Sequence, residues 1–245
     1  MKTKIAAIIP ARWASTRFPG KALHPIAGKP LIQHVWERCR AAREVDDVIV
    51  ATEDMRIAAA AFAFGAEVSF TSPRHRSGTD RVAEVAARLP GVSHVINVQG
   101  DEPLIDPALI NRLAKTLREN PGMGMVTAAN AVTGEQIASP HTVKVVLDRA
   151  SDALYFSRSP LPFFRESDSA ARYYRHQGIY GYSKTFLLQF VKWKPTPLEK
   201  AECLEQLRAL ENGAKIRVLI TRSVSMGVDT PEDVETVSGL LMKSP

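Results

Sequence analysis

The sequence predicts an α/β fold in which a mostly parallel central sheet carries helices on both faces. Short runs rich in β-branched residues alternate with segments of helical spacing through the first half of the chain, which is the pattern of successive βαβ units. The apolar runs are continuous rather than alternating, as expected of strands that are covered on both faces. Together the two observations indicate a sheet enclosed between two helical layers.

The elements of the first half follow in chain order. The expected strands are residues 5–9, 48–52, 68–71, 95–99 and 123–131. The expected helices are residues 31–43, 55–65 and 107–120, together with one that ends at residue 89. Leu31 and Val35 recur at helical spacing in the first helix, and Ser77 or Thr79 can cap the helix that ends at residue 89. Residues 12–30, rich in glycine, proline and basic side chains, are expected to form a long loop.

The second half is less regular. Residues 142–195 are expected to form a small β-rich subdomain inserted over the sheet, within a single domain that spans residues 1–245. Its expected strands are residues 142–147, 153–156 and 176–182. Helices at 186–193 and 198–211, a strand at 215–221 and a closing helix at 230–242 follow. Thr230 can cap that last helix, with Pro231 at its first position.

Composition excludes several classes of protein. The chain has 245 residues, of which 45% are hydrophobic and 24% charged, which is ordinary for a globular protein. Its two cysteines cannot build a disulfide framework. The longest apolar run, residues 57–66, is roughly half the length that spans a bilayer. Pro10 interrupts the apolar start of the chain too early for a signal peptide. We therefore expect a cytoplasmic protein with no membrane partner.

The formal net charge of +6 is compatible with simple solubility or with an anionic substrate. Nucleic acid is not expected as a partner, because the chain has no run of five like charges and aromatic residues make up only 7%. Ligands of open α/β sheets bind beyond the carboxyl ends of the strands. Residues that follow positions 9 and 98 are therefore the places where chemistry is expected.

A basic loop follows the first strand directly. Arg12, Arg17 and Lys21 supply three cations, Ser15 with its neighbour supplies two hydroxyls, and Gly20 permits close backbone approach. Such a set can gather phosphate oxygens, because arginine offers a fork of donors and lysine a compact charge. The Walker pattern is absent. The alternative is a solvated basic loop.

Two carboxylates and one glycine turn form the next candidates. Asp101 stands at the end of a buried strand in the segment VQGDEP, and Asp229 begins a helix in MGVDTPED. If they face one another, they could hold Mg²⁺ together with a triphosphate; otherwise they are a turn and a helix start. Ser77 and Gly78 could contact an anion or a base edge, or simply cap a helix.

A third set of side chains suits a polyhydroxylated acid. The set offers a cation (Arg158), a neutral donor (His176), a phenol (Tyr180), a carboxylate (Glu205) and an amide (Gln206). Arg158 would take the carboxylate of the ligand. The alternatives are a solvated acidic helix face for the glutamate and a buried, hydrogen-bonded histidine.

Seven motifs in consistent order make the sequence similar to a known family. They are IIPARWASTRFPGK, HRSGTDR, NVQGDEP, LYFSRSPLPF, RHQGIYGY, PLEKAECLEQLR and MGVDTPEDVE, and they cover nearly the whole chain. The chain resembles the 3-deoxy-D-manno-octulosonate (Kdo) cytidylyltransferases. The resemblance implies a nucleotide-sugar transferase-like fold and a homodimer. It also implies that CTP and Kdo react with Mg²⁺ to give CMP-Kdo and pyrophosphate, for lipopolysaccharide inner-core synthesis in the cytoplasm.

The resemblance also assigns residues. Arg12, Ser15 and Lys21 match the CTP-binding loop, to which we add Arg17, and Ser77 with Gly78 matches the cytosine contacts. Asp101 and Asp229 match the metal ligands, and Asp101 also counts among the CTP contacts. The sugar pocket matches Gln99, Arg158, His176, Tyr180, Glu205 and Gln206. Arg12, Lys21, Asp101 and Asp229 are expected to be catalytic.

Three positions depart from the family pattern, and alternatives stay open. Ser151 stands where glycine is usual, Ser183 where arginine is expected, and Trp13 is an unusual loop residue. The acceptor could instead be 8-amino-Kdo or a sialic acid. A non-catalytic nucleotide-sugar sensor on the same fold is the alternative of a different class.

Overall fold

The computed structural model describes residues 3–14, 18–165 and 172–243. Its strands are β1 (Lys4–Ala11), β2 (Pro25–Ile26), β3 (Lys29–Pro30), β4 (Asp47–Thr52), β5 (Glu67–Phe70), β6 (Val92–Asn97), β7 (Met125–Val132), β8 (Lys144–Leu147), β9 (Ala153–Ser157), β10 (Tyr173–Ser183) and β11 (Ile216–Thr221). Its helices are α1 (Leu31–Arg40), α2 (Met55–Ala63), α3 (Gly78–Arg88), α4 (Pro107–Glu119), α5 (Lys184–Phe190), α6 (Pro197–Glu202), α7 (Gln206–Glu211) and α8 (Pro231–Lys243), with short 3₁₀ turns η1 (Lys21–Leu23) and η2 (Gly134–Ile137).

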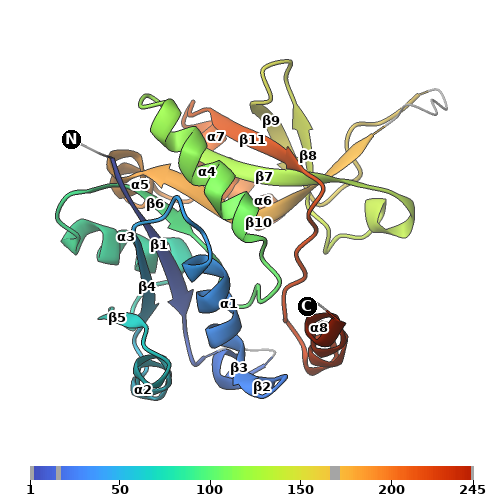
Figure 1. Cartoon of the computed structure of the whole chain (residues 1–245). Coiled ribbons are helices and arrows are strands. Elements are labelled where there is room, and N and C mark those ends of the chain that lie inside the picture. The colour runs from blue at the N-terminus through green and yellow to red at the C-terminus, as the bar shows by residue number, and fades with distance from the viewer. Residues whose placement is uncertain (1–2, 15–17, 166–171, 244–245) are drawn as a thin grey trace.

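One large sheet organises the molecule, with strand order β11-β7-β10-β6-β1-β4-β5 (Figure 1). Neighbours β5, β4, β1 and β6 run parallel, as do β7 and β11. β10 runs antiparallel to both β6 and β7. The predicted mostly parallel sheet is confirmed, with one reversed strand in its interior.

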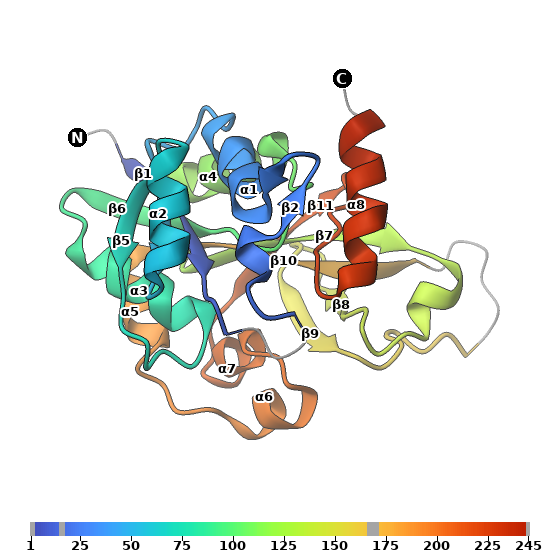
Figure 2. The same ribbon diagram turned by 90° about the horizontal axis from the view of Figure 1, so that it is seen from below.

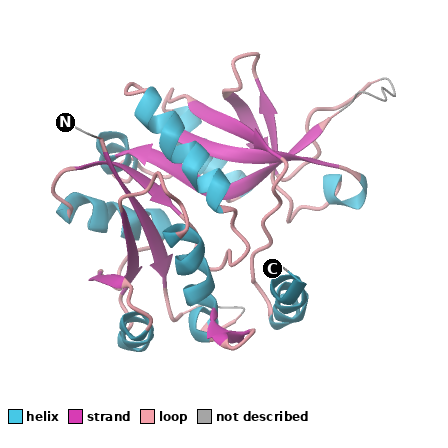
Figure 3. Cartoon of the chain, viewed as in Figure 1, coloured by secondary structure: helices cyan, strands magenta, loops and turns pink. Residues whose placement is uncertain are grey.

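Helices cover both faces of this sheet (Figure 3). Ile5, Ala7 and Ile9 of β1 pack with α1, α2 and α4 in one buried cluster. Ala6 and Ile8 pack with α3, α5 and α7 in the other. Successive side chains of a strand point to opposite faces, so an uninterrupted apolar strand is buried by two helical layers. This arrangement leaves the carboxyl ends of the parallel strands open to ligands.

The last helix is joined to the body by a small cluster of its own. Val228 and Val237 are buried against Ile26 and Leu31, next to the β2–β3 hairpin. Figure 2 shows α8 standing beside β2. The segment between β11 and α8 thus crosses from the edge of the sheet to the region of η1, carrying Asp229 with it.

Part of the expected inserted segment belongs to the central sheet. The strand expected at 176–182 is β10, whose register shifts between Gln177 and Tyr180. Such an irregularity re-aims the side chains beside it. The β8–β9 hairpin extends from the start of β10, where Lys144 pairs with Arg175.

Two local predictions need correction, and two departures from the family pattern gain an explanation. The single helix expected at 198–211 is wrong, because Cys203 adopts a left-handed conformation (φ 53°) that separates α6 from α7. The loop expected at 12–30 contains η1 and the β2–β3 hairpin. Ser151 also has a positive φ of 65° in the β8–β9 turn, where glycine is favoured. Ser183 caps α5 by accepting a hydrogen bond from the Phe186 amide.

None of the helices in the described ranges combines the length and the apolar character that crossing a bilayer requires.

Candidate active site

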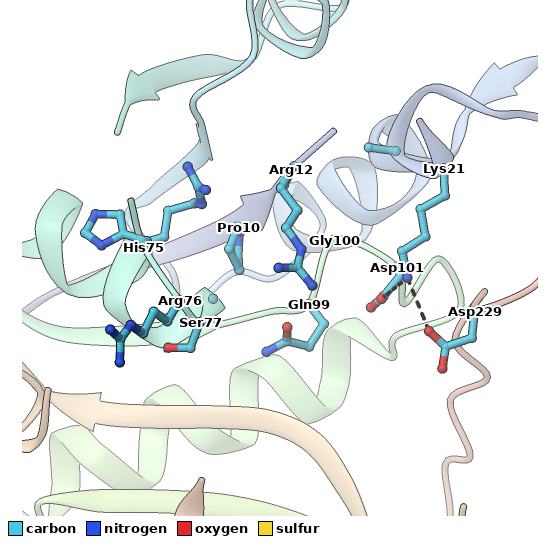
Figure 4. A pocket seen from close by; sticks show the side chains of 14 residues that line it. Pro10, Arg12, Lys21, His75, Arg76, Ser77, Gln99, Gly100, Asp101 and Asp229 are labelled. Atoms are coloured by element: carbon cyan, nitrogen blue, oxygen red, sulfur yellow. Dashed lines mark hydrogen bonds and ion pairs between the residues drawn. The ribbon is translucent and has the colours of Figure 1, made fainter. Parts of the chain in front are cut away.

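A polar cavity of about 380 Å³ opens beyond the carboxyl ends of β1 and β6 (Figure 4). Segments far apart in the sequence meet there. Its lining consists of Pro10, Ala11, Arg12, Lys21, Ala22, His75, Arg76, Ser77, Gly78, Arg81, Gln99, Gly100, Asp101 and Asp229. Seven predicted site residues are thereby brought together: Arg12, Lys21, Ser77, Gly78, Gln99, Asp101 and Asp229.

Lys21 joins the two predicted aspartates. Its Nζ lies 2.5 Å from Asp101 Oδ2 and 3.3 Å from Asp229 Oδ1, and donates to Val228 O at 3.1 Å (Figure 4). The aspartates therefore face one another, which is the condition under which they could hold a cation together. Two carboxylates around one position create a place of strong attraction for cations.

Backbone contacts place both carboxylates. At Gly100 a Cβ atom would lie 2.7 Å from Pro10 O, so only glycine lets the turn bearing Asp101 pass this close to β1. The Val228 amide donates to Asp101 O at 2.8 Å. Asp233 accepts hydrogen bonds from the amides of Asp229 and Thr230 at the start of α8. Asp229 is consequently both a helix-start residue and a cavity residue.

Ser77 likewise has two roles. Its Oγ accepts from the Asp80 amide at 3.1 Å, and Asp80 Oδ2 accepts from the Ser77 amide at 3.2 Å. This reciprocal capping box begins α3. Because the cavity lies at the amino end of that helix, the first amides and the helix dipole favour an anion there.

Cationic side chains outnumber carboxylates in the cavity. Arg12, Lys21, Arg76 and Arg81 stand against Asp101 and Asp229, so the lining suits a ligand of several negative charges. Arg81 was missed by the sequence analysis. It could have been found, because it lies one helical turn beyond Ser77, on the same face of α3.

Arg81 is held on the floor of the cavity. It is only 4% exposed, and its Nη2 forms an ion pair with Glu53 at 2.5 Å. Burial lowers the pKa of its guanidinium, and the nearby Arg12 adds to that effect. The Glu53 carboxylate compensates this buried cation and fixes the position of the guanidinium in the cavity lining.

Glu102, beside Asp101, was also missed. Its carboxylate accepts a hydrogen bond from Ser225 Oγ, and the Gln177 side chain donates to Ser223 O at 2.6 Å. Both contacts fasten the segment that precedes Asp229. Burial raises the pKa of Glu102 to about 7, although the Ser225 hydrogen bond opposes that shift. No pattern in the sequence distinguishes it from an ordinary residue of the GDEP turn.

The predicted sugar residues are only partly gathered. Glu205 lies with Arg76 and Ser77 in an adjoining cavity of about 530 Å³. Its Oε2 accepts from Thr79 Oγ1 at 2.5 Å, and burial raises its pKa. Gln99 lines the main cavity. Arg76 and Ser77 belong to the linings of both cavities, so the two cavities meet at the amino end of α3.

His176, Tyr180 and Gln206 lie outside the lining of both cavities; His176 and Gln206 are buried, and Tyr180 is half-buried. The rings of His176 and Tyr180 lie 5.3 Å apart, and burial raises the pKa of Tyr180. Gln206 is 4% exposed, and its Nε2 has no hydrogen-bond partner among the described residues. His176 Nε2 lies 3.0 Å from Thr127 Oγ1, as in the alternative of a buried, hydrogen-bonded histidine, whereas contact of these three residues with a sugar stays a prediction.

Arg158 lies apart from both cavities. Its Nε donates to Glu202 O and its Nη1 to Pro140 O, each at 2.8 Å. Two backbone carbonyls thus already hold the guanidinium, and its predicted contact with a sugar carboxylate stays a prediction. Ser15 and Arg17, the remaining predicted CTP contacts, lie outside the described residues.

The carboxylate pair suits a hard divalent cation. Magnesium is bound in proteins by one or two carboxylates, with substrate phosphates and water completing its ligands. Asp101 and Asp229 supply two such oxygens around one cationic position. The described part of the chain holds no group of three or more His, Cys, Asp or Glu side chains suited to a metal. The residues present therefore fit a Mg²⁺ ion that shares its coordination with a phosphate ligand.

Burial of His176 predicts a pH dependence of stability. Burial and Arg175 lower its pKa from 6.5 to about 3, so the unfolded chain takes up a proton before the folded one does. The contribution of neutral His176 to the free energy of unfolding is therefore complete above pH 6.5 and is lost as the pH falls toward 3. Between pH 7 and pH 4, the parent is expected to lose on the order of 2 kcal/mol more unfolding free energy than His176→Gln. Urea unfolding of both proteins at the two pH values measures this; equal losses would contradict the assignment.

Comparison with known proteins identifies relatives across nearly the full chain. A family model described as Cytidylyltransferase matches residues 6–216. The 3-deoxy-manno-octulosonate cytidylyltransferase of Geobacter sulfurreducens is 55% identical over 244 residues, covering 95% of this chain and 97% of the relative. A protein of the same name from Myxococcus xanthus is 50% identical over 238 residues, covering 97% and 96%.

Solved structures agree with these sequence relatives. CMP:2-keto-3-deoxy-manno-octonic acid synthetase, solved in complex with CTP, has a TM-score of 0.96 and 42% identity, covering 99% of this chain and all of the other. The 4-diphosphocytidyl-2C-methyl-D-erythritol synthase of Anaerococcus prevotii has a TM-score of 0.66 at 16% identity, covering 99% and 97%. The second likeness is one of fold alone.

Proposed function

The chain belongs to the cytidylyltransferase family, and from this premise we propose that it transfers the CMP group of CTP to the anomeric hydroxyl of Kdo. The products are CMP-Kdo and pyrophosphate. The observation that carries the proposal is the Lys21–Asp101–Asp229 centre, set within a cavity rich in cations at the carboxyl ends of β1 and β6. Relatives at 50–55% identity and a 42% identical structure with CTP carry names for this same activity.

The reaction needs charge neutralisation and alignment. The anomeric oxygen of Kdo bonds to the α-phosphorus of CTP, and the bond from that phosphorus to the bridging oxygen breaks. Pyrophosphate leaves with the electron pair, and the hydroxyl proton passes to solvent. Both reactants are anionic, so positioned cations lower the barrier more than covalent assistance could.

The protein's own residues supply these effects. Arg12 and Lys21 both line the cavity and can neutralise the charge that grows on pyrophosphate. The amino end of α3 at Ser77 offers amides to an oxygen of the nucleotide or to its base. Gln99, which also lines the main cavity, can exchange hydrogen bonds with a substrate through its amide.

We further propose Mg²⁺ as cofactor, held by Asp101 and Asp229 together with phosphate oxygens. When bound, it would polarise the phosphoryl group and lower the pKa of an attacking hydroxyl. Lys21, now between the carboxylates, would then turn its ammonium toward the phosphates.

For the acceptor, we propose the adjoining cavity that contains Glu205 and meets the main cavity at Arg76 and Ser77. Glu205, held by Thr79, can accept hydrogen bonds from sugar hydroxyls.

A homodimer and a cytoplasmic location complete the proposal. Leu154 on β9 and Phe163 in the segment after it are 62% and 87% exposed, and we propose this region for the contact with a second copy.

Pyrophosphate release tests the acceptor. Purified protein is incubated with CTP, Mg²⁺ and one of three acceptors: Kdo, its 8-amino analogue or N-acetylneuraminate. Pyrophosphate release is then compared between the three. Release with Kdo alone supports the proposal. Release only with another acid would keep the CTP assignment and replace the acceptor. CTP binding without release from any acid would favour the non-catalytic sensor.

A further inference from the structure

Trp13 and Gly20 close the neck of the basic loop. The Gly20 amide donates to Trp13 O at 3.1 Å. Gly20 has φ 72°, and a Cβ there would lie 2.9 Å from Cη2 of the Trp13 ring. The ring therefore rests directly on the glycine. The residues just outside this neck are Arg12 and Lys21, both in the cavity lining, so the neck sets the separation of these two cations.

Arg56 holds the ring in place from another element. Its guanidinium carbon lies 3.4 Å from the centroid of the Trp13 ring. Asp54 fixes that guanidinium with two hydrogen bonds, of 3.0 Å from Nε and 2.6 Å from Nη2. Asp54 also caps α2 by accepting from the amides of Arg56 and Ile57. The stack thereby ties the loop neck to the junction between β4 and α2.

We infer that Trp13 and Arg56 are positioning residues that hold Arg12 and Lys21 at the spacing a triphosphate requires. Neither belongs to the cavity lining, so they act through the loop rather than on substrate. A loop neck held in place before binding avoids a loss of conformational freedom at Arg12 and Lys21 when the nucleotide arrives. The charge of Arg56 is balanced by Asp54 and the ring, which keeps it from competing with Arg12 for phosphate. This inference rests on the proposed function.

The test compares ligands that share a base but differ in phosphates. We expect Trp13→Ala to raise the Kd of CTP about tenfold through loss of this preorganisation. Its effect on CMP should be smaller and on cytidine negligible. Arg56→Ala should raise the Kd of CTP about threefold, as for an exposed cation–π contact. Trp13→Phe, which retains an aromatic ring over Gly20, should restore most of the affinity. Isothermal titration calorimetry measures all three ligands.

Kinetics separate positioning from a general structural effect. The KM for CTP should rise in Trp13→Ala and Arg56→Ala, while the KM for Kdo stays unchanged. Lys115→Ala is the matched control, since it removes an exposed cation from an ion pair with Glu119. If Trp13→Ala fails to fold, Arg56→Ala and Trp13→Phe still decide. CTP bound equally by parent and all variants would overturn this inference alone. A parent that binds no CTP would overturn the proposed function as well.

Discussion

Replacing Asp101 by asparagine is expected to lower kcat about 1,000-fold, as when a group that stabilises transition-state charge is lost. The substitution keeps the size of the side chain but removes one of the two charges around Lys21. It also weakens the proposed Mg²⁺ site, which would then depend on Asp229. The affinity for CTP should fall less than about tenfold, because Arg12, Lys21 and the amino end of α3 remain. Steady-state kinetics and CTP titration measure the two effects separately.

Asp106→Asn is a matched control on the same loop. Asp106 caps α4 by accepting from the Ala108 amide, and asparagine caps a helix equally well. We expect near-parental kcat from this variant. Near-parental kcat in Asp101→Asn at low Mg²⁺ would contradict the catalytic role of the carboxylate.

Lys21→Met is expected to reduce kcat/KM for CTP about 1,000-fold, through loss of a cation that binds phosphate. The substitution would also lower the stability of the folded protein, because Asp101 and Asp229 would repel one another without the ammonium between them. Lys21→Arg should recover only part of the activity, since its planar fork cannot replace a compact ammonium that contacts three acceptors. Initial rates over a range of CTP concentrations test whether kcat/KM falls from the parent to Lys21→Arg and further to Lys21→Met.

Lys29→Met serves as the control for Lys21. It removes a lysine that forms an ion pair with Glu37 at 2.8 Å on the surface, and its kinetics should match those of the parent. Equal CTP kinetics in Lys21→Met and Lys29→Met would exclude Lys21 from the reaction.

Local rules predict most of the fold. The apolar run that forms β1 is buried on both faces, so a short, continuous apolar run was enough to locate it and its parallel neighbours. The failure at 198–211 is instructive. The helical spacing of apolar residues continues across Cys203, from Leu198 to Leu207. The backbone nevertheless turns left-handed at Cys203, and no residue type in the segment signals that turn. The place of β10 between β6 and β7 depends on long-range pairing, which a local pattern does not contain.

The candidate site was predictable where a motif follows a strand. Asp101, Ser77 and Arg12 stand at such positions, and the fold brings them together at one edge of the sheet. Asp229 could be assigned through the family resemblance but not from its surroundings, because a helix start looks the same with or without a partner across the sheet. Glu102 and the stack of Trp13 with Arg56 depend on contacts between distant segments, and these appear only in three dimensions.

The most direct test of the central claim is a phosphorus NMR spectrum of CTP and Kdo incubated with the protein and Mg²⁺. The account predicts that the three CTP resonances decline together, while a pyrophosphate resonance grows with about twice the intensity of one new phosphodiester resonance, because pyrophosphate has two equivalent phosphorus atoms. Omission of Kdo should leave CTP intact. Release of inorganic phosphate with CDP, or unchanged CTP in a folded protein that binds it, would contradict transfer at the α-phosphate.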